Sequence, residues 1–310
     1  MTIVVAGGTG LAGSAIVRAY QAQGDEVIAL NRSVVDLLDR DATMKYIASV
    51  KPSLVVDAAA KVGGIGANNS YPVEFLSDNI RIQSNLMEAA HAADVEKFIF
   101  LGSSCIYPRD CAQPIKEEYL LTGPLEQTNS AYAIAKIAGI ELIRSFRKEY
   151  GRTWISLMPT NLYGPNDNFE LQGSHVLPAF IRRFVEAAEK GAPVETLWGT
   201  GSPMREFLHV DDLAAAVVHL GKVYNESDHI NIGTGEDLTI KALAELVAEL
   251  SGFKGEIAWD SSKPDGTPRK VLDVSKAKSL GWAPKISLRD GIAQTIAWYK
   301  DATAKGVARR

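Results

Sequence analysis

The chain has 310 residues, about twice the length of an average domain, which predicts two folding units or one large unit with an added lobe. Hydrophobic residues make up 46% of it and charged residues 23%, a composition that excludes a disordered, collagen-like or disulfide-dense protein. The formal net charge is -4, which gives no indication of binding to nucleic acid or to an anionic membrane. Any anionic ligand must therefore be bound by positive charge that is concentrated locally.

The cysteines and the N-terminal segment indicate the cellular compartment. Cys105 and Cys111 are the two cysteines, and their spacing fits neither a CxxC redox pair nor half of a zinc site. The chain passes from Met1 straight into apolar residues, without a basic leader or a small-residue cleavage site. The apolar run 213–218, one of the longer ones, is far shorter than the roughly 18 residues that cross a bilayer. We expect a cytoplasmic protein with neither a membrane nor a nucleic-acid partner.

Short apolar runs alternate with longer segments of helical periodicity in the first half of the chain. We interpret five of these runs, all rich in residues that favour strands, as β-strands: 3–6, 26–31, 54–57, 97–101 and 154–158. Each run is largely apolar instead of alternating, which indicates a strand buried on both faces. Parallel strands joined by right-handed helical crossovers meet this condition. The predicted fold class is therefore α/β, with a doubly wound parallel (Rossmann) sheet.

The pattern of the sequence changes after Met158. Pro159, Gly164 and Pro165 belong to a turn-rich stretch, and helical periodicity resumes only near Ser174. Further on, the pattern predicts a helix over 210–223 and a strand over 229–232 that rejoins the sheet. We therefore expect a sheet domain formed by residues 1–160 and about 206–233. A smaller, discontinuous lobe would then consist of about 161–205 and 234–310.

A glycine-rich turn follows the first predicted strand and leads into a helix. Glycines recur every third residue in this turn, whose seven residues are Gly7, Gly8, Thr9, Gly10, Leu11, Ala12 and Gly13. Glycine allows close approach of the backbone to a pyrophosphate, towards which the N-terminus of the next helix directs free N–H groups. The alternative is an ordinary strand-to-helix turn. The position after the first strand of an α/β sheet favours dinucleotide binding.

The end of the second predicted strand bears on the choice between NAD and NADP. Asn31-Arg32-Ser33 stands where an NAD-binding fold usually has Asp or Glu for the ribose 2′-hydroxyl. A carboxylate would repel a 2′-phosphate, whereas Arg32 can bind one with two hydrogen bonds, so NADP(H) is the predicted cofactor. The alternatives are that Arg32 is only solvated, or that Asp36 or Asp39 replaces it. We expect Asp36 to belong instead to the turn before the next helix.

Tyr132 and Lys136 are four residues apart in a predicted helix over 130–150, which puts both side chains on one face. Taken alone, an exposed tyrosine–lysine pair is the ordinary interpretation. The segment Leu101-Gly102-Ser103 adds weight, because it ends a predicted strand at the edge where α/β sheets bind ligands. A tyrosine hydroxyl needs a nearby cation to exchange a proton at neutral pH, and Ser103 can bond a substrate oxygen. The set is typical of an oxidoreductase.

Through the glycine turn, the strand-end serine and the Tyr132/Lys136 pair, the chain resembles the extended short-chain dehydrogenase/reductases. Longer stretches between about residue 3 and about residue 300 resemble the GDP-L-fucose synthase family within them. These stretches are 58–65 (AAAKVGGI), 101–108 (LGSSCIYP), 132–139 (YAIAKIAG), 158–165 (MPTNLYGP), 203–212 (PMREFLHVDD) and 263–270 (KPDGTPRK). The resemblance implies epimerisation of GDP-4-keto-6-deoxy-D-mannose at C3 and C5, then reduction of its C4 ketone by NADPH to GDP-L-fucose.

The resemblance also implies roles for individual residues. Ser103 and Tyr132 would stabilise the enolate that forms beside the ketone, and Lys136 would hold the nicotinamide ribose. Cys105 matches the family's base, and His175 matches the acid that reprotonates carbon from the opposite side. From the residues alone, Cys105 is as readily a small buried hydrophobe, and His175 a capping or surface residue. Cys111 has no such match, and we expect it to be structural.

Further contacts follow from the same resemblance. The residues that match substrate positions are Arg183, Trp198, Arg205 and Asp265. Two arginines can neutralise a diphosphate, and an indole offers a flat face to a base or ribose. We expect Arg182, the neighbour of Arg183, to point to solvent. We expect Asn161 and Leu162, with Pro159 and Thr160, to line the nicotinamide end of the cofactor. Beyond the glycine turn and Arg32, the residues expected to bind the cofactor are Leu101, Gly102, Ser103, Lys136, Pro159, Asn161, Leu162 and His175.

Metal binding and alternative functions complete these expectations. The other histidines have no metal-ligand spacing, so we expect no metal, and His209 is interpreted as structural. One competing function is a nucleotide-sugar 4-epimerase or dehydratase of the same family, which would show no net NADPH oxidation. Another is a non-catalytic NADP-sensing protein, against which the intact Ser103/Tyr132/Lys136 set argues. We also expect a homodimer, in which the helices over 72–93 and 130–150 pair as in the family.

Overall fold

A parallel six-stranded sheet forms the centre of the protein, whose computed structural model describes residues 1–171, 173–263 and 265–310. The strand order is β10-β5-β4-β3-β1-β2, and every neighbouring pair is parallel. The strands are β1 (Thr2–Ala6), β2 (Glu26–Leu30), β3 (Leu54–Asp57), β4 (Lys97–Leu101), β5 (Ile155–Pro159) and β10 (Ile230–Ile232). The predicted doubly wound sheet is confirmed, and β10 rejoins it beside β5 as expected.

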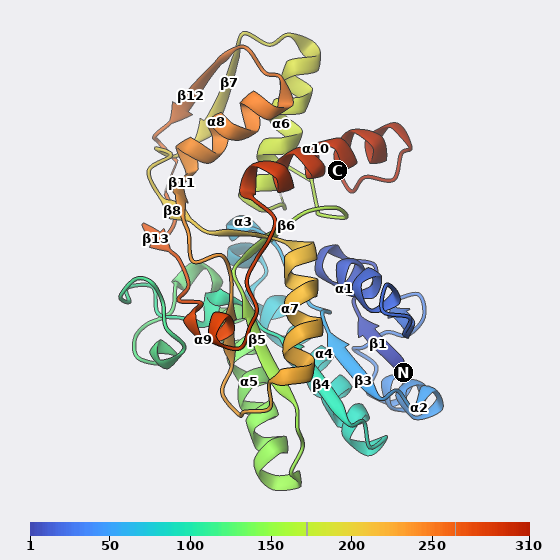
Figure 1. The fold of residues 1–310 in the computed structure, drawn as a ribbon. Coiled ribbons are helices and arrows are strands. Elements are labelled where there is room, and N and C mark those ends of the chain that lie inside the picture. The colour runs from blue at the N-terminus through green and yellow to red at the C-terminus, as the bar shows by residue number, and fades with distance from the viewer. Residues whose placement is uncertain (172, 264) are drawn as a thin grey trace.

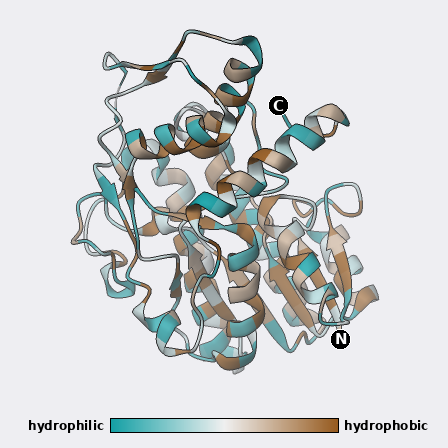
Figure 2. Ribbon diagram, turned by 45° about the horizontal axis from the view of Figure 1, so that its top comes forward, coloured by the Kyte–Doolittle hydropathy of each residue, from teal (hydrophilic) through white to brown (hydrophobic). Residues whose placement is uncertain are grey.

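Helices cover both faces of this sheet (Figure 1). One face packs against α1 (Leu11–Gln21) and α7 (Val210–Val223), the latter with the predicted bounds. The other face packs against α2 (Arg40–Val50), α4 (Pro72–Ala92) and α5 (Ser130–Tyr150). Apolar residues are concentrated on the strands and on the helix faces turned towards them, as the brown colour in Figure 2 shows. Burial of continuous apolar strands on both faces is the condition that the sequence pattern predicted.

The second lobe has its own apolar core, formed around three helices and a two-stranded sheet. These are α6 (Val176–Lys190), α8 (Ile240–Ser251) and α10 (Leu288–Ala304), with β7 (Val194–Trp198) parallel to β12 (Glu256–Asp260). The helices α6 and α8 end at Gly191 and Gly252, which adopt the left-handed conformation that closes a helix C-terminus. In Figure 1 this lobe lies above the sheet, at the end where several of the parallel strands finish.

Short elements connect the lobe to the sheet. A three-stranded sheet has the order β11-β8-β13, with β8 (Met204–Arg205), β11 (Leu238–Thr239) and β13 (Arg269–Lys270). A further pair joins β6 (Asn161–Tyr163) to β9 (Phe207–His209). The remaining elements are α3 (Ile65–Ser70), α9 (Ser275–Ser279) and the 3₁₀ turns η1 (Ser104–Ile106), η2 (Glu117–Tyr119) and η3 (Gln127–Asn129).

Two features differ from the local sequence pattern. The turn-rich stretch after Met158 contains the strand β6, because pairing with β9, more than forty residues later, outweighs its turn propensity. The fifth strand begins at Ile155 and ends at Pro159, so it is displaced by one residue from the predicted run. The proposed limits of the sheet domain and the lobe stay a prediction. Within the described ranges, no helix combines the length and apolar character that a membrane crossing needs.

Candidate active site

The glycine turn between β1 and α1 has the geometry of a pyrophosphate-binding loop. Gly7 adopts a positive φ of 71°, and a Cβ on Gly13 would lie 2.1 Å from the Gly7 carbonyl oxygen. Gly10 caps α1 without a side-chain hydrogen bond, so the first N–H groups of the helix are left for a ligand. The turn therefore fits the dinucleotide that the sequence predicts at Gly7 to Gly13, with Leu11 and Ala12 in the first turn of α1.

The residues after β2 form a fixed turn from which Arg32 is exposed. The Asn31 side chain accepts hydrogen bonds from the backbone N–H and the hydroxyl of Ser33, which fixes the turn. Arg32 is exposed and lies 3.6 Å from the Asp36 carboxylate, a weak surface pair that leaves the guanidinium available. Asp36 accepts a hydrogen bond from Leu38 N–H within the turn before α2, and Asp39 caps α2. Both aspartates thus have structural contacts, as expected for Asp36.

Ser103, Tyr132 and Lys136 meet at the C-terminal end of β4. Lys136 is buried, and its ammonium donates a 2.9 Å hydrogen bond to the carbonyl of Leu101, the last residue of β4. The same ammonium lies 5.9 Å from the centre of the Tyr132 ring. Burial raises the pKa of Tyr132, and a hydrogen bond with Ser103 opposes that rise. The structure therefore brings together the three residues of the predicted reductase set, with a protonated phenol as the resting state.

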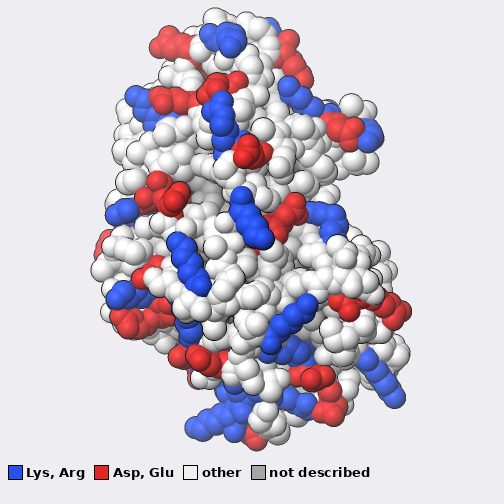
Figure 3. Space-filling model, in the orientation of Figure 1, with Lys and Arg blue, Asp and Glu red and all other residues white. Residues whose placement is uncertain are grey.

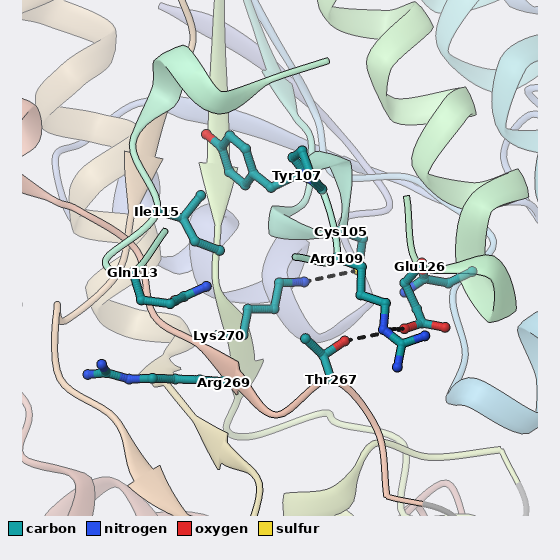
Figure 4. Close-up of a pocket in the computed structure, with 11 residues that line it drawn as sticks. Cys105, Tyr107, Arg109, Gln113, Ile115, Glu126, Thr267, Arg269 and Lys270 are labelled. Carbon is teal, nitrogen blue, oxygen red and sulfur yellow. Dashed lines mark hydrogen bonds and ion pairs between the residues drawn. The ribbon is translucent and has the colours of Figure 1, made fainter. Parts of the chain in front are cut away.

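Cys105 acquires a charged neighbour that lies far away in the sequence. It follows Ser103 in η1, and the Lys270 ammonium of β13 lies 3.6 Å from its sulfur (Figure 4). The ammonium can donate a hydrogen bond to the sulfur and places a positive charge beside it. The two cysteines are free thiols, and burial raises the pKa of the Cys111 thiol, so the two differ in environment.

His175 lies immediately before α6, where its side chain does not cap the helix. The His175 side chain is exposed to solvent, although many protein atoms lie near it. Desolvation lowers the pKa of His175, and the positive charge of Lys270 lowers it further. Lys270 thus acts electrostatically on both of the residues to which the resemblance assigns acid–base roles.

The predicted substrate residues lie in the lobe. Arg183 on α6 donates hydrogen bonds to Glu195 and to the Thr196 carbonyl, so its direction is fixed and its charge is partly offset. We expected Arg182 to point to solvent, and this prediction is wrong. Its guanidinium pairs with Glu186 at 2.9 Å and also bonds the carbonyl of Phe169, because α6 turns this side chain towards the preceding loop.

Trp198, Arg205 and Asp265 lie around the end of β7 and the small sheet of β8. The indole of Trp198 is 72% exposed, with the Lys263 ammonium 5.8 Å from its ring centre. Burial lowers the pKa of Arg205, and the charge of Asp265 acts against it. Asp265 accepts hydrogen bonds from the backbone and the hydroxyl of Thr200, so it shapes the loop after β7. Pro264 of the same sequence motif lies outside the described residues.

On the face seen in Figure 3, basic and acidic side chains are interspersed. This face therefore offers separate basic side chains and no broad basic surface.

The residues predicted at the nicotinamide end lie on and between β5 and β6. Pro159 ends β5, and Asn161 and Leu162 begin β6. The Asn161 amide donates a 2.8 Å hydrogen bond to the carbonyl of Glu206, which fixes the amide between the sheet and the lobe. Leu162 packs against the core on the α1 and α7 face. His209 is buried and accepts a hydrogen bond from Asp211 N–H at the start of α7, which confirms its structural role.

Sequence reasoning missed three charged residues of this region. Lys270 had a signal, since it ends the motif 263–270, but its contact with Cys105 spans 165 positions. Asp57 had a weaker one, a carboxylate at the end of an apolar strand. Glu206 is buried and had no clear signal. Among the residues that the structure describes, no three His, Cys, Asp or Glu side chains cluster as a metal site would need.

Comparison with known proteins identifies the family. Residues 3–233 match the model of the NAD dependent epimerase/dehydratase family. The chain belongs to this family. Within it, the chain is 55% identical over 298 residues to "Putative GDP-L-fucose synthase 2" of Arabidopsis thaliana, covering 96% of this chain and 91% of that protein. It is 51% identical over 307 residues to the GDP-L-fucose synthase of Escherichia coli K12, covering 96% of each.

A solved structure agrees with these family relatives. The GDP-L-fucose synthetase of Naegleria fowleri, bound to NADP, superimposes with a TM-score of 0.91 at 28% sequence identity. The match covers 100% of this chain and 96% of that one. The two proteins thus share one fold over the length of the chain. The predicted resemblance to the GDP-L-fucose synthases is confirmed.

Proposed function

We propose that this protein converts GDP-4-keto-6-deoxy-D-mannose into GDP-L-fucose, by epimerisation at C3 and C5 followed by reduction at C4 with NADPH. One observation carries the proposal. A Tyr132/Lys136 pair and a thiol with an ammonium 3.6 Å away both lie beside Ser103, at the C-terminal end of β4. The first is suited to protonate a ketone oxygen during reduction by NADPH, and the second to remove a proton from the carbon beside it.

The epimerisation requires a base, an acid and a bound enolate oxygen. The Cys105 thiolate, stabilised by Lys270, removes the proton from C3 or C5. As that C–H bond breaks, the electron pair moves to the keto oxygen, which accepts hydrogen bonds from Ser103 and Tyr132. The His175 imidazolium then gives a proton to the opposite face of the carbon. Because the pKa of His175 is lowered, its imidazolium is a stronger acid but is populated less at neutral pH.

The reduction uses the same keto oxygen. NADPH, when bound at the glycine turn, supplies the hydride that adds to C4. Tyr132 gives its proton to O4 as the C=O bond becomes a C–O bond, and the ammonium of Lys136 stabilises the phenolate that remains. Ser103 keeps the oxygen in place during both stages. Arg183 and Arg205 would bind the diphosphate and Trp198 the base or ribose, while Asp265 shapes the loop beside them.

Replacing Tyr132 by Phe separates the two stages. Tyr132→Phe removes the proton donor of the reduction but leaves Cys105 and His175 in place. With GDP-4-keto-6-deoxy-D-mannose and NADPH in heavy water, deuterium should still enter C3 and C5, while NADPH oxidation falls by at least about 100-fold. Mass spectrometry of the sugar and absorbance at 340 nm measure the two signals.

The wild-type protein is the positive control, and its product should be GDP-L-fucose with one NADPH oxidised per sugar. Turnover of a nucleotide sugar without NADPH loss would support a 4-epimerase or dehydratase instead. Ligand-dependent binding to another protein without any turnover would support the NADP-sensing alternative. Equal loss of both signals in Tyr132→Phe would contradict separate acid–base groups.

We also propose that two copies associate through α4 and α5, which pack against each other and expose apolar side chains. Val73 on α4 is 77% exposed and Ile134 on α5 is 48% exposed, so a second copy could bury both. Sedimentation velocity should show a dimer of about 67 kDa, twice the 33.5 kDa chain, and Val73→Glu should shift it towards the monomer. A reducing cytoplasm, which we propose as its location, would keep Cys105 as a free thiol.

A further inference from the structure

A buried carboxylate that the proposed chemistry does not use lies beside the reducing pair. Asp57 ends β3, and its side chain has no exposed surface. One carboxylate oxygen accepts a 3.1 Å hydrogen bond from Ala59 N–H, and the other has no hydrogen-bond partner among the described residues. An ionised carboxylate buried in this way is costly unless a positive charge compensates it.

Lys136 is the group that compensates it. In the register of the sheet, Asp57 of β3 lies beside Phe100 of β4. The Lys136 ammonium lies 4.8 Å from the centre of the Phe100 ring. Leu101, which accepts the Lys136 hydrogen bond, is the next residue of β4. Asp57 and Lys136 thus belong to one cluster at the ends of β3 and β4, in which each acts electrostatically on the other.

The charges around Asp57 come from few elements. Burial raises the pKa of Asp57 to about 6, against the opposing effects of Lys136 and the Ala59 hydrogen bond. Burial lowers the pKa of Lys136, and Asp57 opposes this in turn. On α5, Tyr132 also responds to the charge of Asp57. The strands beside β3 contribute Ala6 and Phe100, and the buried polar residues of α4 are the uncharged Asn79, Gln83 and Asn85.

We propose that Asp57 is a positioning residue for the reduction: its buried carboxylate holds Lys136 in the ammonium form that supports Tyr132. This inference rests on the proposed function, because it gives Lys136 its role in the reduction. Among the described residues, no hydrogen bond joins the Asp57 carboxylate to Tyr132, so its proposed effect passes through Lys136. When Asp57 takes up a proton, or is replaced by a neutral residue, Lys136 loses its compensating charge and gives up its own proton more readily.

The first test uses the chain without cofactor or substrate. Thermal unfolding is measured for the wild type, Asp57→Asn, Lys136→Met and the double variant, at pH 8 and at pH 5. At pH 8 the change in unfolding midpoint of the double variant should differ from the sum of the two single changes by roughly 2 °C or more. At pH 5 Asp57 is protonated, since its pKa is about 6, and the coupling should disappear. Additive effects at pH 8 would overturn the proposal.

The second test follows the reduction itself by single-turnover NADPH oxidation between pH 5 and pH 9. In the wild type the rate should fall as the pH drops through about 6. In Asp57→Asn the rate of NADPH oxidation should not fall as the pH drops through about 6. Its decline at alkaline pH should begin at a lower pH than in the wild type, and at pH 8 the rate should be about tenfold lower. Deuterium entry at C3 and C5 should stay within about twofold of the wild type. A general structural defect would slow both stages together and would overturn the proposal.

Asp167→Asn is the matched control. Asp167 is also buried, with its pKa raised to about 7 by burial and one oxygen without a described partner, but it lies in the loop before α6 and interacts with Arg309. Its replacement should leave the acid limb of the reduction in place. If the wild type oxidises no NADPH with this substrate, the proposed function fails, while the unfolding cycle still decides whether Asp57 and Lys136 are coupled. An unchanged pH profile in Asp57→Asn, with an active wild type, would overturn this inference alone.

Discussion

The environment of Cys105 shows how an ordinary residue type gains reactivity from a distant part of the chain. Its sulfur has the Lys270 ammonium at 3.6 Å, whereas burial raises the pKa of the other thiol, Cys111. The same lysine lowers the pKa of His175. One side chain therefore contacts the proposed base and also favours proton release from the proposed acid.

Replacing Lys270 by Met should make Cys105 less reactive. Without the ammonium, the sulfur loses the hydrogen-bond donor and the positive charge beside it, and alkylation by iodoacetamide at pH 7 should slow by about tenfold. Mass spectrometry of the peptide that contains Cys105, in a Cys111→Ser background, measures the rate. Lys278→Met, which removes an exposed lysine from the same segment, should leave the rate unchanged. Equal rates in Lys270→Met and the wild type would show that the contact does not activate the thiol.

The turn between β1 and α1 is the element in which sequence and geometry agree most closely. The three spaced glycines let the backbone fold back on itself, and the side-chain-free cap of α1 leaves donors for phosphate. The neighbouring strand β3 restricts the shape of this turn, because Gly7 packs against the carbonyl of Ala58, the residue that follows β3. A local motif therefore becomes a binding site only where the neighbouring strand fixes its shape.

Gly13→Ala should weaken cofactor binding. The new Cβ would lie 2.1 Å from the Gly7 carbonyl oxygen, a distance that forces the turn to open. The dissociation constant for NADPH, followed by its fluorescence, should rise by about 100-fold as the N–H groups lose their alignment. Gly66→Ala is the control, since nothing lies within 4 Å of a Cβ there. Unchanged NADPH affinity in Gly13→Ala would exclude this turn as the pyrophosphate site.

At the scale of the whole molecule, buried polar contacts join the lobe to the sheet. The Glu206 carboxylate accepts hydrogen bonds from the N–H groups of Thr234, Gly235 and Leu272, at 2.6, 2.7 and 2.9 Å. Asp212 on α7 accepts two more, from Lys285 and Ile286. Segments that precede and follow β10 are thereby connected near β8, which carries the predicted substrate residue Arg205.

Glu206→Gln should destabilise the protein. A carboxamide has one acceptor oxygen, so it cannot accept from both Gly235 and Leu272, and a buried N–H is left without a partner. The free energy of unfolding should fall by about 1–3 kcal/mol. Urea unfolding measures this change, and Glu236→Gln, at an exposed position nearby, is the control. A loss no larger than that of the control would show that these bonds do not stabilise the junction.

The sequence by itself determined the features that depend on local pattern. Apolar strand runs, helix periodicity and the glycine spacing predicted the parallel sheet, the bounds of α7 and the turn at Gly7 to Gly13, because each follows from neighbouring residues. Tyr132 and Lys136 were found by their spacing on one helix. The tertiary structure alone decided the contacts that cross the chain: Lys270 beside Cys105, Asp57 near Lys136, Glu206 at the junction, and Arg182 turned towards Glu186. These contacts join residues that lie far apart in the sequence, and the strength of each depends on how deeply the fold buries it. Local pattern therefore cannot reveal them.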